Sequence, residues 1–104
     1  MKYKSQDALQ VAEKLIQELK LACTQIEISG ALAMGAKSVD HVEIHYKPIL
    51  EWRRLGPFGQ QQVNLVDEKI AWLTRNNMLE RSSGSLLHKA TRIPIRMFNQ
   101  NAKY

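Results

Sequence analysis

The chain has 104 residues, of which 44% are hydrophobic and 24% charged, the composition of one ordinary globular domain spanning residues 1–104. No apolar run approaches the roughly 20 residues that a membrane-spanning helix requires, so no membrane association is expected. The lone Cys23 excludes a disulfide within the chain. Because the first residues lead into an amphipathic pattern rather than a signal peptide, we expect a cytoplasmic protein.

The net charge of +5 is unevenly distributed. Residues 1–52 carry six Lys or Arg and seven Asp or Glu, whereas residues 53–104 carry nine and three, with Lys103 the last of the nine. Basic surfaces attract nucleic acid phosphates, although spread charges are also typical of a solvated surface. The candidate nucleic-acid-binding residues are Arg53, Arg54, Lys69, Arg75, Arg81, Lys89 and Arg92.

Residues 5–22 predict an amphipathic helix. Ser5 is the expected N-cap, and apolar residues recur at helical spacing from Ala8 to Ala22. Such a stripe is typical of a helix lying on a sheet. Cys23, which follows this stripe, is expected to be a small buried core residue rather than a nucleophile.

Two alternating segments predict strands. The first, Gln25–Ser29, ends at Gly30, and the small-residue turn Gly30–Ser38 follows it, with Leu32 and Met34 expected to pack. The second strand is His41–Lys47, which Pro48 ends. Its two faces carry Val42, Ile44 and Tyr46 on one side and His41, Glu43 and His45 on the other.

The segment 47–62 predicts a loop because it contains Gly56, Pro57 and Gly59. Its aromatic residues, Trp52 and Phe58, are expected to anchor this loop by capping the core.

A second helix is predicted from Asn64, its N-cap, to about Asn76, with Val66, Ile70 and Leu73 on the buried side. Short strands follow at Met78–Ser82, Leu86–Thr91 and Ile93–Phe98, with a Ser83-Gly84 turn after the first, and residues 99–104 are expected to fray. This order predicts an α+β fold, a small mixed sheet with two main helices packed on one face.

Three parts of the sequence resemble the polymerase beta-like, family X nucleotidyltransferases. These enzymes carry a strand, the turn G-S-x-R-R-G, and an acidic D-x-D or D-x-E on the next strand. The chain has Ile26–Gly35 and then Val39–His45, with Gly30, Gly35 and Glu43 matching. Its segment 92–98, RIPIRMF, resembles the family segment G-V-P-V-D-L-F, whose aspartate is the third metal ligand. In order and spacing the likeness extends from about residue 8 to residue 98, and it implies a minimal nucleotidyltransferase palm.

The resemblance also implies that the catalytic chemistry is lost. Ala31 stands at the serine position that would help to cradle a triphosphate, His41 at the first metal-binding acid, and Arg96 at the third. Two Mg²⁺ ions held about 4 Å apart need several converging carboxylates, and Glu43 alone does not supply them. If Arg96 lies beside Glu43 as the family layout implies, the two should form an ion pair in place of the metals.

The leading hypothesis is therefore a catalytically inactive nucleotidyltransferase-like domain that binds a protein or nucleic acid partner without a cofactor. The first alternative is an active minimal nucleotidyltransferase that uses Mg²⁺. A more distant one is a metal-binding protein that uses His41, Glu43 and His45, because two imidazoles and a carboxylate are a common zinc ligand set. The sequence identifies neither the partner nor the oligomeric state.

Overall fold

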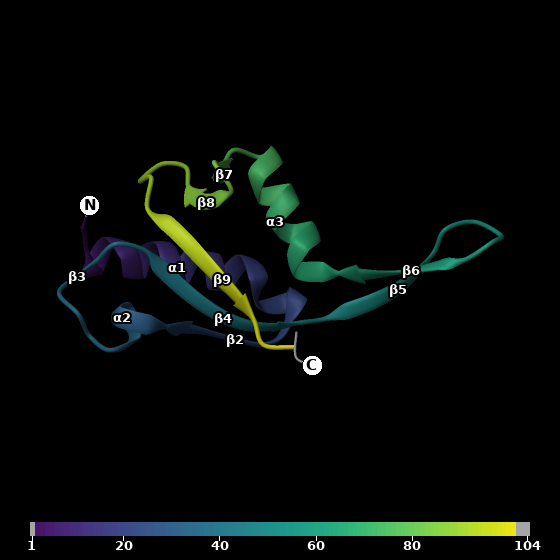
Figure 1. The fold of residues 1–104 in the computed structure, drawn as a ribbon, viewed down its shortest axis with the longest axis horizontal. Coiled ribbons are helices and arrows are strands. Elements are labelled where there is room, and N and C mark those ends of the chain that lie inside the picture. Colours follow the sequence, from purple (N-terminus) through teal and green to yellow (C-terminus); the bar gives the residue numbers. More distant parts are fainter. Residues whose placement is uncertain (1, 102–104) are drawn as a thin grey trace.

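A computed structural model describes residues 2–101, and the end of the expected frayed tail, residues 102–104 with Lys103, lies outside the described residues. The chain forms a five-stranded mixed sheet in the order β2-β4-β9-β8-β7. The short strands β1 (Tyr3–Lys4) and β3 (Ser38–Val39) pair separately. Strands β5 and β6 form a third, two-stranded sheet. Figure 1 shows this hairpin extending away from the rest of the molecule.

The first half of the chain follows the predicted order. Helix α1 (Ser5–Leu19) continues as a 3₁₀ turn, η1 (Lys20–Ala22), into strand β2 (Cys23–Ser29). A single helical turn, α2 (Gly30–Ala33), leads toward strand β4 (Val42–Pro48), which is antiparallel to β2. Pro48 does end this strand, as predicted.

The second half supplies the other helix and the remaining strands. Helix α3 (Leu65–Arg75) begins at Asn64, whose Oδ1 accepts hydrogen bonds from the backbone N–H groups of Val66 and Asp67, so the predicted N-cap is confirmed. Strands β7 (Leu79–Ser82) and β8 (Ser85–His88) form a hairpin, and β9 (Pro94–Asn99) follows. Positive φ angles at Ser83 and Gly84 fit the two-residue turn that joins β7 to β8.

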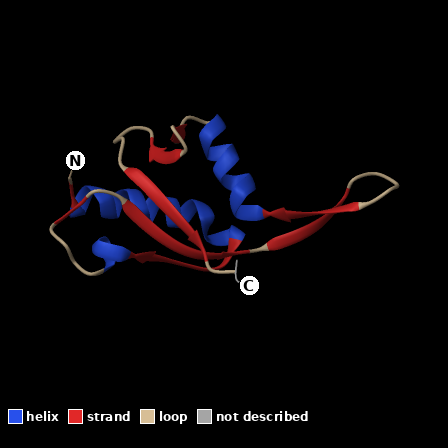
Figure 2. Ribbon diagram, in the orientation of Figure 1, coloured by secondary structure: helices blue, strands red, loops and turns tan. Residues whose placement is uncertain are grey.

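The α+β arrangement with helices on one face of the mixed sheet is confirmed. One continuous core joins apolar side chains of α1 and α3 to those of β4, β7, β8 and β9. Ile44 lies at its centre with no exposed surface, and Val42 and Tyr46 of the same strand are also buried. Figure 2 shows the helices and strands of this body, with β9 crossing in front of α1. Because one sheet face is covered, the polar side chains of β4 lie on the other face.

The largest correction concerns the predicted loop at residues 47–62. It is a hairpin formed by β5 (Leu50–Arg54) and β6 (Gln60–Asn64). Trp52 is 64% exposed and Phe58 is 97% exposed, so the expectation that they cap the core was wrong. Neither hairpin face is covered by another layer, so the pattern of a half-buried strand is weak here. Only residues 50–53 alternate, and the glutamine run at residues 60–62 does not.

Smaller corrections concern single residues. The N-cap of α1 is Lys4 rather than Ser5, whose hydroxyl instead donates to the carbonyl oxygen of Ala36. Met34 is 88% exposed and does not pack, whereas Leu32 does pack against the core. Asn99 belongs to β9, and the Gln100 N–H donates to the Tyr46 carbonyl oxygen at 2.7 Å, so the chain does not fray at residue 99. These backbone bonds anchor the C-terminal part of β9 to β4.

Candidate functional site

The candidate site lies on the open face of the sheet, where β4 runs between β2 and β9. Alternation along β4 buries Val42 and Ile44 and directs Glu43 and His45 to the open face, as predicted from the sequence. His41 comes immediately before the strand and lies beside Glu43.

Strand β9 runs parallel to β4 and completes the site. The register places Arg96 opposite Glu43 and Phe98 opposite His45. The His45 and Phe98 rings meet edge to face, with centroids 5.3 Å apart. The predicted neighbourhood of Glu43 and Arg96 is thus present in the backbone register.

The side chains, however, do not form the expected ion pair. The carboxylate of Glu43 is hydrogen-bonded to His45 Nε2 at 3.1 Å and, more weakly, to His41 Nε2 at 3.5 Å. Among the ion pairs of residues 2–101 none involves Arg96, which is exposed. The prediction was wrong because His41 and His45, rather than Arg96, bond the carboxylate.

Asp40 extends this network, and its part was not foreseen. Its Oδ1 lies 2.7 Å from His41 Nδ1, so His41 bridges the carboxylates of Asp40 and Glu43. This contact lowers the pKa of Asp40. Burial raises the pKa of Glu43, but the hydrogen bonds and charges of His41 and His45 outweigh it and leave that pKa below its usual value. Both carboxyl groups are therefore held in their ionised forms.

Gly30 closes the site from the side of β2. Its φ of +71° favours glycine, and a Cβ at this position would lie 2.8 Å from Glu43 Oε1. Ala31 follows in α2. The backbone turn that would cradle a phosphate in the family is thus packed against a carboxylate, whose negative charge opposes a bound phosphate.

The residues at this site do not fit a pair of Mg²⁺ ions. Mg²⁺ prefers oxygen ligands in octahedral geometry. The three positions that carry metal-binding acids in the family hold the imidazole of His41, the carboxylate of Glu43 and the guanidinium of Arg96. The arrangement does not favour the zinc alternative either. The Nε2 atoms of His41 and His45 are hydrogen-bonded to Glu43, so the three side chains do not converge on one point between them. Within residues 2–101, no group of three or more His, Cys, Asp or Glu side chains is arranged to hold a metal.

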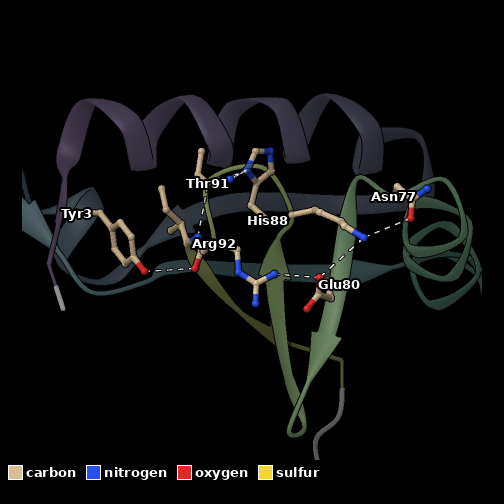
Figure 3. Close-up of polar contacts among 8 residues, drawn as sticks. Tyr3, Asn77, Glu80, His88, Thr91 and Arg92 are labelled. Carbon is tan, nitrogen blue, oxygen red and sulfur yellow. Dashed lines mark hydrogen bonds and ion pairs between the residues drawn. The ribbon is translucent and has the colours of Figure 1, made fainter.

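The basic residues proposed for nucleic acid binding are spread over several elements. Figure 3 shows Arg92 approaching Glu80, with its Nη1 2.9 Å from Glu80 Oε1. The Nζ of Lys89 lies 3.9 Å from the same oxygen. Arg53 bonds Glu51 and Glu68, and Lys69 Nζ lies 3.5 Å from Glu18. Carboxylates therefore balance four of the seven charges.

The other three basic residues, Arg54, Arg75 and Arg81, take part in none of the ion pairs found in the described part of the chain. They lie on three different elements, β5, α3 and β7. Arg54 differs from the others because it lies near two exposed aromatic residues, Trp52 and Phe58, on the hairpin.

Cys23 is a buried residue of the core, and burial raises the pKa of its thiol, so it is not an activated nucleophile. His88 accepts a hydrogen bond at Nδ1 from the Thr91 N–H (3.3 Å), and burial and Lys14 lower the pKa of its imidazole. Both arrangements favour the neutral side chains and serve the structure.

Comparisons of the chain with protein-family models, with curated proteins and with solved structures find no match. None of the helices described in residues 2–101 is long and apolar enough to cross a membrane.

Proposed function

We propose that this chain is a nucleotidyltransferase-like domain that has lost catalysis and acts as a binding module for a macromolecular partner. The observation that carries the proposal is the composition of one row of side chains on the open sheet face. Glu43 stands there with His41, which comes immediately before the same strand, beside it and Arg96 opposite it in the register. These are the three positions at which the family resemblance places metal-binding acids.

The charges at these three positions oppose the binding of Mg²⁺. Two Mg²⁺ ions bring four positive charges, and the enzymes that use them offset those charges with converging carboxylates. Here one carboxylate is already hydrogen-bonded to two imidazoles, and a permanent cation is its cross-strand neighbour. Such a site repels the ions on which nucleotidyl transfer depends.

Restoring the missing acids gives a direct test. We expect no Mg²⁺-dependent binding of a nucleoside triphosphate by the wild-type chain in isothermal titration calorimetry. The double variant His41→Asp with Arg96→Asp should gain Mg²⁺ binding, because it returns carboxylates to both positions. A matched control, His88→Asp with Arg75→Asp, makes the same changes in charge away from the site and should gain nothing.

Two results would contradict the proposal. Micromolar, Mg²⁺-dependent triphosphate binding or nucleotidyl transfer by the wild type would favour the active-enzyme alternative. Equal Mg²⁺ binding by the restored variant and its control would remove the link between this site and the family's metal positions. Zinc analysis of the purified protein tests the alternative based on His41, Glu43 and His45.

A further inference from the structure

The β5–β6 hairpin, which we call the arm (residues 50–64), is built unlike the rest of the molecule. Every residue from 50 to 62 is exposed. The arm gives the molecule its long axis of 53 Å, against 28 and 23 Å for the other two, and Figure 1 shows it without a covering layer. A lone two-stranded hairpin is only marginally stable in water, so a free arm of this kind is suited to contact with another molecule.

The arm presents aromatic surface that the fold does not use. Trp52 is 64% exposed, and Phe58 at the tip is 97% exposed. The tip also contains Gly56 at φ +89°, and the Leu55 N–H donates to the Gly59 carbonyl oxygen at 2.9 Å, which closes the turn. This hydrogen bond closes the turn, and Phe58 points outward from it.

The face of the arm that carries Trp52 also carries polar donors. The register pairs Trp52 with Gln62 and Arg54 with Gln60, and alternation places all four side chains on the same face. The neighbouring strand positions, Glu51 and Arg53, point to the other face, where Arg53 is bonded to Glu51 and to Glu68 of α3. The only carboxylate of the arm is thus neutralised, and the guanidinium of Arg54 has no carboxylate partner among the described residues.

These features favour nucleic acid over protein as the partner. The core of a protein interface is apolar. The arm also exposes Leu50 and Leu55, but the strand facing Trp52 carries Gln60, Gln61 and Gln62, with Gln62 opposite the ring. Amide groups and an unpaired guanidinium bind phosphates and base edges, and the chain as a whole carries a charge of +5. Exposed aromatic rings are the surfaces on which unpaired bases stack, whereas bases inside a duplex are already stacked on each other.

We infer that the arm binds single-stranded nucleic acid, with bases stacked on Trp52 and Phe58 and a phosphate bound by Arg54. This inference rests on the proposed binding function and names the class of its partner. It gives Arg53 a different role from Arg54: Arg53 ties strand β5 to α3 through Glu68, and Arg54 contacts the ligand. Binding should show little preference for sequence, because stacking is available to every base.

The test uses fluorescein-labelled oligodeoxythymidylate and oligouridylate, with a labelled duplex for comparison, in fluorescence anisotropy at 50 mM salt with EDTA. We expect the single strands to bind more tightly than the duplex. Trp52→Ala and Phe58→Ala should each weaken binding about 5- to 150-fold, the range of an alanine substitution that removes one stacked base. Arg54→Ala should weaken binding and flatten its dependence on salt, since one phosphate contact is lost.

Matched controls remove an exposed apolar side chain elsewhere. Leu21 is 86% exposed and Met34 is 88% exposed, and both lie outside the arm, so Leu21→Ala and Met34→Ala should leave the affinity unchanged. In a Trp72→Phe background Trp52 is the sole tryptophan, and its fluorescence should be quenched when a base stacks on it. Circular dichroism checks that each variant keeps its fold.

The inference is overturned if single strands do not bind, if the duplex binds more tightly, or if the arm variants retain wild-type affinity. It is also overturned if sedimentation shows a dimer that Trp52→Ala converts to a monomer, because the arm would then contact a second copy of the chain. Because EDTA removes metal ions, the binding measured in this test does not depend on nucleotidyl transfer. Metal-dependent nucleotidyl transfer would overturn the loss of catalysis and leave binding by the arm intact.

Discussion

At the scale of single residues, the position of the Glu43 carboxylate depends on a glycine that faces it. His41 and His45 bond its two oxygens, and Gly30 leaves the space that Oε1 occupies. A methyl group on residue 30 would displace the carboxylate and weaken both hydrogen bonds. The hydrogen bonds of Glu43 therefore depend on the missing side chain at Gly30, the first residue of α2, as much as on the two histidines.

Comparing alanine substitutions at two glycines with similar backbone angles distinguishes the effect of this contact from that of backbone strain. Gly30 and Gly35 have φ of +71° and +83°, but only Gly30 has a neighbour where a Cβ would be placed. Gly35→Ala should cost about 1–2 kcal/mol from the left-handed backbone alone. Gly30→Ala should cost about 1 kcal/mol more, because hydrogen bonds of Glu43 are also lost. Urea unfolding measures both, and equal losses would show that the contact with Glu43 contributes nothing.

The lowered pKa of Glu43 predicts how stability changes with acid. Its hydrogen bonds with the histidines hold the pKa in the folded state below the value of about 4.3 expected when unfolded. The contribution is therefore complete above about pH 5 and is lost as the pH falls through 4.3 toward the folded-state pKa.

Glu43→Gln should consequently flatten the fall in the free energy of unfolding between pH 5 and pH 3. Asp40, whose pKa is also lowered, remains in the variant and should retain part of the slope. Denaturant unfolding at several pH values gives the two curves. Parallel curves for wild type and variant would contradict the role assigned to Glu43.

The sequence predicted the backbone positions of this site but not its side-chain contacts. Alternation along residues 41–47 placed Glu43 and His45 on one face, and the family resemblance placed Arg96 next to Glu43, as the register shows. Neither pattern contains side-chain torsions, so neither could tell that the histidines rather than Arg96 would bond the carboxylate. Asp40 was missed because it lies outside the alternating segment.

At the scale of elements, the helices and strands that bury one face were the ones that the sequence pattern predicted. The apolar stripes of α1 and α3 and the alternation of β4 record the position of the core. The arm buries neither face, and Gly56, Pro57 and Gly59 at its tip were interpreted as the sign of an irregular loop. A signal was nevertheless present in residues 51–54 and 60–63, which flank this turn without glycine or proline.

The junction between the arm and α3 depends on one side chain. Asn64 ends β6 and its Oδ1 accepts from the N–H groups of Val66 and Asp67, so it both terminates the arm and starts the helix. Asn64→Ala should lower the free energy of unfolding by about 1 kcal/mol, as expected for the loss of an N-cap. Asn64→Ser retains an acceptor and should restore most of that loss in thermal or urea unfolding. If serine is no better than alanine, the cap is not what stabilises this junction.

At the scale of the whole molecule, the described chain consists of the arm and a body, by which we mean the described residues outside the arm. The buried core lies entirely in the body, and none of its residues belongs to the arm. Stability and binding should therefore be separable by position.

A shortened arm tests that separation. Replacing residues 54–60 by Asn-Gly joins the paired residues Arg53 and Gln61 through a two-residue hairpin turn and keeps the contact of Arg53 with Glu68. The replacement removes Arg54 and Phe58 but no buried side chain, and shorter loops cost little entropy to close. We expect the free energy of unfolding to stay within about 0.5 kcal/mol of the wild type, the range for surface changes. Binding of single-stranded oligonucleotides should fall to the level of nonspecific charge attraction.

The core variant Ile44→Ala supplies the contrast, because it should cost about 2–5 kcal/mol, and whatever fraction of it remains folded should keep the affinity of the arm. A shortened arm that unfolds the body would instead show that the tip stabilises the fold, and its exposed aromatic residues would then need another explanation.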